Sequence, residues 1–269
     1  MKLKLLILLF IGVIPLSAGV LYEERLLTDV NPEYRPFKKG EFLRFNIHYG
    51  IIDAGEATFS VKDTDVVIAG NKHYSVKVTG RSYRSWDYFF KVRDYYYSYI
   101  DSSTMMPTVY SRNVLEGDYK NSESYYFDRK KAEARGRSMG ADTSVSIPFN
   151  VQDLASMIYF ARSFKFYERE VGTKLPINVF FDSEWYECGA TLVGYENVKT
   201  KLGTFKCMKI VPELVSGRVF KGQRDMVVYV SADKNQIPVR VESEIFIGSI
   251  KVDLIEFKNV SYPLSSKID

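Results

Sequence analysis

The sequence has 269 residues, of which 15% are aromatic and 26% are charged. Its 37 Lys and Arg residues nearly balance its 33 Asp and Glu residues, which argues against a nucleic-acid partner, because nucleic acid selects strongly basic surfaces. The length is sufficient for one large β domain with a single core.

The first stretch, 1–19, has the three-part pattern of a secretory signal peptide. Lys2 and Lys4 precede an apolar run over residues 5–14, and small residues occupy 17–19. The run is shorter than the roughly 20 apolar residues that a membrane span needs, although an uncleaved anchor is the alternative. No Cys lies directly after the run, so a lipid-modified N-terminal cysteine is not expected. We therefore expect an exported protein, most simply periplasmic, that is at most peripheral to the membrane.

Residues 20–148 are expected to form an N-terminal half made of strands. In "GEFLRFNIHYG" the apolar residues Leu43, Phe45 and Ile47 alternate with polar ones, as in a half-buried strand. Turn-forming residues follow at short intervals, as in "AGN" and "EGDYKN". This spacing predicts an antiparallel all-β arrangement.

Residues 149–168 interrupt the strands and are expected to form a linking helix. Pro148 ends the preceding strand, and Asn150 can cap the helix. Apolar residues then recur at helical spacing in two stripes, Val151, Leu154, Ala155 and Ile158 in one and Met157, Phe160, Ala161 and Phe164 in the other. A helix that is apolar over most of its circumference must be buried on most sides.

Residues 169–269 are expected to form a C-terminal β half that resembles the first. The segments 107–117 and 238–248 both begin with Pro and end with Gly, which suggests an internal duplication; chance recurrence of turn residues is the alternative. We expect two similar, strongly curved sheets that form a half-barrel or roll within one structural domain. The helix near 150–165 would lie between them, where sheet covers both of its apolar stripes.

Three stretches of the chain resemble an exported bacterial family catalogued as domain of unknown function 3108. They are "GEFLRFNIHYGIIDAGEATFSV", "FFKVRDYYYSYIDSSTMMPTVYSRNVLEGDY" and "VVYVSADKNQIPVRVESEIFIGSIKVDL". The likeness covers nearly all of the chain after the signal pattern. The family consists of envelope proteins without an assigned activity, so the resemblance implies export and an all-β fold and transfers no catalytic residues.

Two cysteines, Cys188 and Cys207, raise the question of a disulfide in an exported chain. A turn centred near Lys201 and Leu202 would place Cys207 opposite Glu196, roughly 26 Å along the strand from Cys188 at 3.3 Å per residue. A disulfide needs Cα atoms within about 7 Å. We therefore expect no bond between them, unless a bulge or a third strand brings them together.

Several patterns that carry chemistry in other proteins are interpreted as structural here. "GRSMG", 136–140, matches a nucleophile elbow, but it lacks the flanking strand and helix and a later His, so we expect a turn. His48 and His73 lie on polar strand faces without partners at metal-like spacing and are expected to be exposed or locally hydrogen-bonded. No phosphate loop or dinucleotide fingerprint is present. We expect no metal and no cofactor.

The stretch "FFDSEWYEC" is expected to place Asp182, Glu184 and Tyr186 on one strand face, since residues two apart on a strand share a face. Paired carboxylates divide acid and base roles in glycoside cleavage, so an envelope glycan hydrolase is retained as a third hypothesis. Surface carboxylates at this density are ordinary, and no catalytic residue is assigned.

The run "SWDYFFKVRDYYYSYID" is expected to be a long strand with aromatic residues on both faces. Either another element covers the second face, or that face is an exposed binding patch, where an Arg could meet an anionic headgroup. The candidate ligand-binding residues are Trp86, Tyr88, Phe90, Arg93, Tyr97, Met157, Phe160 and Phe164.

The leading functional hypothesis is a non-enzymatic envelope protein whose helix-filled trough binds a hydrophobic or amphipathic ligand. Such a ligand is a lipid or a lipoprotein acyl chain, and an envelope protein is the other expected kind of partner. The basis is a likeness of shape to envelope lipoprotein carriers. The alternative is a structural envelope interaction module with a permanently filled core.

Overall fold

The computed structural model describes residues 34–213, 226–244 and 248–269. Within these ranges nearly all regular structure is β-strand, and the helices are short. The N-terminal strands are β1 (Phe42–Tyr49), β2 (Ile52–Val61), β3 (Val66–Ile68), β4 (Asn71–Ser82), β5 (Val92–Asp101), β6 (Pro107–Glu116), β7 (Tyr119–Asp128), β8 (Glu133–Ser138) and β9 (Ala141–Ser146).

The second half of the chain continues in the same manner. Its strands are β10 (Gln152–Asp153), β11 (Lys174–Phe181), β12 (Glu184–Thr200), β13 (Gly203–Glu213), β14 (Met226–Ser231), β15 (Pro238–Glu244) and β16 (Ser249–Lys258). The helical elements are α2 (Arg84–Asp87), α3 (Ser156–Arg162) and the 3-10 turn η2 (Phe166–Glu168). No helix among the described residues is long and apolar enough to cross a membrane.

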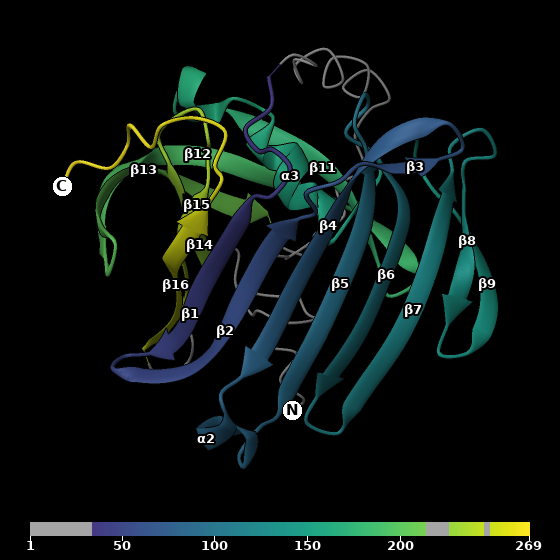
Figure 1. Ribbon diagram of the computed structural model, residues 1–269, viewed down its shortest axis with the longest axis horizontal. Helices are drawn as coiled ribbons and strands as arrows, with labels where there is room; N and C mark the ends of the chain where they lie inside the picture. The colour runs from purple at the N-terminus through teal and green to yellow at the C-terminus, as the bar shows by residue number, and fades with distance from the viewer. Residues whose placement is uncertain (1–33, 214–225, 245–247) are drawn as a thin grey trace.

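The strands form one continuous sheet in the order β10-β11-β12-β13-β14-β15-β16-β1-β2-β4-β5-β6-β7-β8-β9, with β3 beside β4. The pairing is antiparallel except between β10 and β11. The two halves meet where β16 hydrogen-bonds along β1. The expected all-β antiparallel fold is therefore confirmed, whereas the division into two separate sheets is wrong, because this junction joins them (Figure 1).

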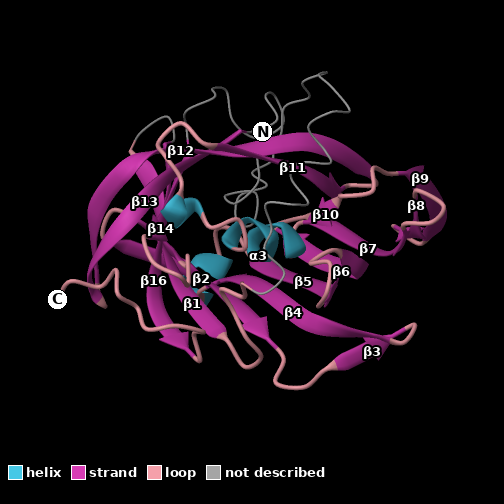
Figure 2. Ribbon diagram, turned by 90° about the horizontal axis from the view of Figure 1, so that it is seen from above, coloured by secondary structure: helices cyan, strands magenta, loops and turns pink. Residues whose placement is uncertain are grey.

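The sheet is strongly curved, and α3 lies within the curve (Figure 2). Aromatic and aliphatic residues on the inner face pack around the helix, and Phe160 and Phe164 are both buried. Tyr159 of α3 packs edge-on against the ring of Phe37, with 4.6 Å between the ring centroids. The expectation that the apolar helix is covered by sheet on more than one side agrees with this packing.

The helix is shorter than the predicted span 149–168. Residues 152–153 form β10 and pair with β11, so the chain is extended where the helix was expected to begin. The carboxylate of Asp153, and not the side chain of Asn150, accepts hydrogen bonds from the N–H groups of Ala155 and Ser156, each at 2.8 Å. Capping by this carboxylate places the start of α3 several residues later than the apolar spacing indicates.

The segments 107–117 and 238–248 follow equivalent turns. Before the first, Asp101 accepts a hydrogen bond from the backbone N–H two residues later at 2.8 Å, and before the second Asp233 does the same at 2.9 Å. A residue with positive φ then precedes each Pro, and Gly117 and Gly248 both have positive φ. The recurrence seen in the sequence thus corresponds to a recurring hairpin geometry.

No disulfide joins the two cysteines. Cys207 lies opposite Glu196 in the β12–β13 pairing, as the turn count predicts, and Cys188 lies opposite Ile177 on β11. "GRSMG" is likewise a hairpin turn, because Met139 and Gly140 with positive φ connect β8 to β9. Both structural interpretations of these motifs are confirmed.

Candidate functional site

A cavity of about 110 Å³ lies between α3 and the inner face of the C-terminal strands. The helix contributes Met157, Ile158 and Ala161, and the strands β11 to β15 form the facing wall. The wall residues are Ile177, Val179, Cys188, Gly189, Ala190, Ile210, Pro212, Val228, Val230 and Pro238.

Small residues on β12 explain why space remains beside the helix. Cys188 and Ala190 lie two residues apart and so share one face of β12, and neither fills the distance to α3 as a larger side chain of a packed core would. Met157 faces them from the helix and is only half-buried. An unbranched, polarizable Met adapts to changes in its surroundings more readily than a branched side chain.

Two polar side chains, Arg162 and Gln236, border this otherwise apolar cavity. The Arg162 guanidinium donates to both carboxylate oxygens of Glu41, at 2.6 and 2.8 Å, and to the Pro36 carbonyl at 3.0 Å. Gln236 donates to the Arg162 carbonyl and accepts from the Tyr167 N–H at 3.3 Å. Because these groups are engaged with the protein, the cavity offers a mainly apolar surface.

The candidate binding residues are divided between two regions. Met157 lines the cavity, and Phe164 packs against Phe166, which also lines it, with 4.8 Å between ring centroids. Phe160 is buried in the surrounding core. The helix and its neighbours therefore bring these three residues together.

The other five candidates lie away from the cavity. The aromatic run is not one long strand, because 84–87 form α2 and β5 begins only at Val92. Tyr88 projects into solvent, and Phe90 packs over Gly117. Trp86 donates a hydrogen bond to β2, and Arg93 forms an ion pair with Asp87. Tyr97 is half-exposed and lies beside Lys77.

A cluster of charged residues, which the sequence pattern did not reveal, lies away from the cavity on the inner face of β5, β6 and β7. Arg112 lies 2.8 Å from Glu123 and also forms an ion pair with Asp182, and all three are largely shielded from solvent. Asp94 is fully buried beside Glu116. Burial, reinforced by the neighbouring Glu116 charge, raises the pKa of Asp94 to about 8, so its carboxyl is mainly protonated at neutral pH.

This cluster does not have the expected carboxylate-pair geometry. Asp182 and Ser183 both have positive φ and form the turn between β11 and β12, so Asp182 does not share a strand face with Glu184 and Tyr186. Glu184 instead accepts a hydrogen bond from the Tyr186 hydroxyl. The prediction of one shared face is wrong for Asp182, because the chain reverses inside the motif, and it agrees with the structure for Glu184 and Tyr186. In the described part of the chain no group of His, Cys, Asp or Glu side chains is suited to hold a metal ion.

The histidines make local hydrogen bonds, as expected. His73 is buried, contrary to its predicted polar face, and contacts the Asn71 carbonyl at 2.8 Å and the Thr108 hydroxyl at 2.7 Å. His48 contacts the Gly50 carbonyl at 2.8 Å and Asp253 at 3.3 Å.

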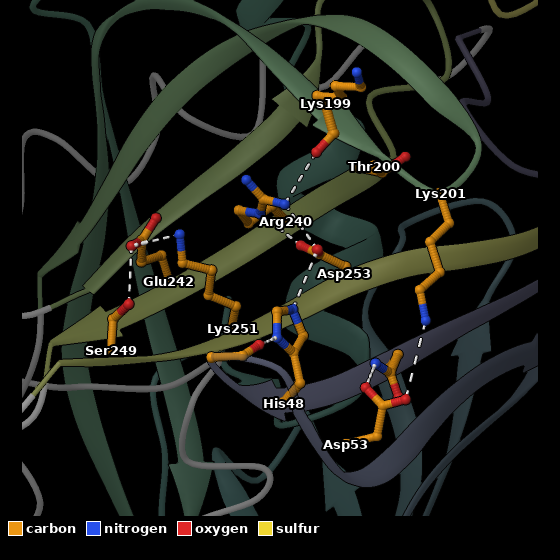
Figure 3. Close-up of polar contacts among 12 residues, drawn as sticks. His48, Asp53, Lys199, Thr200, Lys201, Arg240, Glu242, Ser249, Lys251 and Asp253 are labelled. Carbon is orange, nitrogen blue, oxygen red and sulfur yellow. Dashed lines mark hydrogen bonds and ion pairs between the residues drawn. The ribbon is translucent and has the colours of Figure 1, made fainter.

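His48 belongs to an ion-pair network on the outer face (Figure 3). Asp253 receives two hydrogen bonds from Arg240, at 2.5 and 2.7 Å. Arg240 also donates to the Lys199 carbonyl at 3.1 Å, and Lys201 at the turn reaches Asp53 at 4.0 Å. These contacts connect the β12–β13 turn to β1, β15 and the start of β2, which is a structural role at the junction of the two halves.

The family model described as "Protein of unknown function (DUF3108)" matches residues 44–255. No curated protein matches the chain. Among solved structures, a beta-barrel-like protein of domain of unknown function DUF1849 from Brucella abortus is similar with a TM-score of 0.52 and 7% identity, over 84% of this chain and 100% of that chain. At that identity the likeness concerns the fold.

Two further similar structures have lower scores. One is a candidate exported protein with a YmcC-like fold from Bacteroides fragilis, with a TM-score of 0.35 and 12% identity over 84% of this chain and 98% of that chain. The other is a candidate lipoprotein from Parabacteroides distasonis, with a TM-score of 0.32 and 10% identity over the same 84% and 98%.

Proposed function

The chain belongs to the DUF3108 family of proteins of unknown function, and we propose that it is an exported envelope protein that binds an apolar chain in the cavity beside α3. The observation that carries the proposal is the apolar space between the helix and β11–β15. Export is supported by the signal-peptide pattern of residues 1–19.

The size of the cavity limits what it accepts. At about 110 Å³ it is below the roughly 300–1,000 Å³ of sites that enclose a drug-sized molecule. It is closer to the apolar cavities of about 150 Å³ that admit benzene. We therefore propose a short segment of an acyl chain as the occupant, with the remainder of the ligand outside the cavity.

The proposed role is binding and not catalysis. The two polar side chains at the cavity, Arg162 and Gln236, are engaged in hydrogen bonds with described residues, and an acid or base at work in catalysis must reach the reacting proton. The small volume equally favours the structural alternative, in which the interior is simply an imperfectly filled core. The two functions differ in whether an acyl ligand binds.

Filling the cavity is expected to weaken acyl binding. Ala190→Phe places a large side chain in the wall that faces Met157, so a fluorescent fatty acid such as parinaric acid should bind at least about tenfold more weakly than to the wild type, a loss of about 1.4 kcal/mol. The measurement is a fluorescence titration of delipidated protein.

Val193→Phe is the matched control, because Val193 lies on the same strand but is exposed. This variant should bind the probe like the wild type. Overpacking also costs stability, typically about 1–3 kcal/mol, so both variants are checked by urea unfolding before titration. A wild type that fails to bind the probe would favour the structural alternative, and equal binding by Ala190→Phe would contradict the proposed site.

A further inference from the structure

An exposed apolar cluster lies at one end of the sheet. Because the strands from β1 to β9 form an antiparallel meander, the β1–β2 turn and the β4–β5 connection that contains α2 lie at the same end (Figure 1). Ile51 at the turn is fully exposed, and Tyr88 and Phe89 beside α2 are 90% and 75% exposed. We call Ile51, Ile52, Trp86, Tyr88 and Phe89 the apolar tip.

A hydrogen bond holds the two connections of the apolar tip beside each other, and ring contacts join its aromatic residues. The Trp86 indole N–H donates to the Asp53 carbonyl at 2.9 Å, which fastens the α2 connection next to Ile52. Phe89 contacts the rings of both Trp86 and Tyr88, with centroids 6.0 and 5.5 Å apart. These residues therefore project together from two neighbouring connections.

The apolar tip is held in its exposed arrangement by the structure beneath it. Asp87 forms an ion pair with Arg93 at 2.5 Å and accepts a hydrogen bond from the Ser82 hydroxyl at 2.5 Å. Phe90 turns inward and packs over Gly117. Because neighbouring groups fix the connection in this way, the outward position of Tyr88 and Phe89 is a feature of the folded state.

The charges around the apolar tip leave a local positive excess. Asp87 is paired with Arg93, and Glu56 with Arg81 at 2.8 Å. Arg84 and Lys91 flank the aromatic residues and are exposed. At the same end Asp53 lies 4.0 Å from Lys201, and Asp118 and Lys120 are both exposed in the β6–β7 hairpin.

Aromatic side chains with Lys and Arg at their borders suit the interface of a lipid bilayer. The rings enter the boundary between headgroups and acyl chains, where Trp and Tyr are favoured, and the cations meet anionic headgroups. We propose that the apolar tip docks the protein on the surface of an anionic lipid bilayer. This docking is separate from ligand binding in the α3 cavity.

Co-flotation with vesicles tests the docking surface. The mature chain is mixed with vesicles of phosphatidylethanolamine and phosphatidylglycerol, or of phosphatidylcholine alone, and floated through a density gradient. The wild type should float with the anionic vesicles. Tyr88→Ser/Phe89→Ser should need at least about tenfold more lipid for half-binding, because it removes both exposed rings.

Val67→Ser/Phe149→Ser is the matched control. These residues are 65% and 56% exposed and lie near the opposite end of the sheet, on β3 and after β9. This variant should float like the wild type, as should Ala190→Phe, which separates docking from the cavity. Arg84→Gln/Lys91→Gln should reduce the preference for anionic vesicles.

Two outcomes would overturn the proposal: a wild type that remains at the bottom of the gradient with anionic vesicles, or an aromatic variant that floats as well as the control. Circular dichroism establishes that each variant is folded. Because both rings are exposed, little packing is lost in Tyr88→Ser/Phe89→Ser. The single variant Tyr88→Ser provides a second test and should show a smaller loss of vesicle binding.

Discussion

Arg162→Met is expected to lower the free energy of unfolding by about 3–5 kcal/mol. The substitution leaves the Glu41 carboxylate buried without the cation that now lies 2.6 Å away. It also removes the donor to the Pro36 carbonyl. Arg162 is the last residue of α3, so this ion pair connects the helix to the start of β1 and helps to hold it inside the sheet. The measurement is urea unfolding followed by circular dichroism.

A double variant distinguishes the stability lost with the ion pair from the cost of leaving the Glu41 carboxylate buried without a cation. Arg162→Met/Glu41→Leu removes both charges and should recover much of the stability, since apolar replacement of a whole buried pair is often nearly neutral. Arg81→Met is the control, because Arg81 forms its ion pair with Glu56 at the surface and should cost at most about 1 kcal/mol. A loss below about 1 kcal/mol for Arg162→Met would contradict the role of the Arg162–Glu41 ion pair in holding α3 inside the sheet.

Asp94→Asn is expected to stabilise the protein progressively more as the pH rises from about 4 to about 8. Burial raises the pKa of Asp94 to about 8 in the folded protein, against about 3.9 in the unfolded chain. Between these values the folded state retains a proton that the unfolded state has lost, so rising pH favours unfolding. Asn is uncharged at every pH, so its side chain does not contribute to this pH-dependent loss of stability.

The advantage of the variant should grow by up to about 1.4 kcal/mol per pH unit in this range and level off above it. Urea unfolding of wild type and variant at pH 5, 6.5 and 8 measures the growth. Asp65→Asn is the control, because Lys39 lowers the pKa of the exposed Asp65 carboxyl and no such gain is expected. A pH-independent difference between Asp94→Asn and the wild type would show that Asp94 ionises normally.

The strands could be predicted because alternation of apolar and polar residues reports directly on a half-buried sheet. The Cys207–Glu196 register followed from one turn, since strand pairing on either side of a turn is fixed by counting. The single continuous sheet could not be predicted, because the β16–β1 pairing joins segments about 200 residues apart and no local pattern records it.

The candidate site was predictable only on its helical side. Met157 and Phe164 are recognisable from helical spacing, but the facing wall depends on which strands pass behind the helix, and Cys188 and Ala190 have no distinctive pattern. The burial of Asp94 and Arg112 could not be predicted, because the sequence does not show that the β11–β12 turn brings Asp182 to this face. The late start of α3 depends on Asp153, whose capping role is set by the β10–β11 pairing.

Alkylation of Cys188 in the presence of a fatty acid tests most directly whether an apolar chain enters the α3 cavity. Cys188 lines the cavity, whereas Cys207 is buried elsewhere and burial raises the pKa of its thiol to about 12, which makes it an unreactive internal reference. With iodoacetamide and mass spectrometry, we expect dodecanoate below its micelle concentration to slow alkylation of Cys188. An unchanged Cys188 rate at the highest dodecanoate concentration would contradict the proposed binding site.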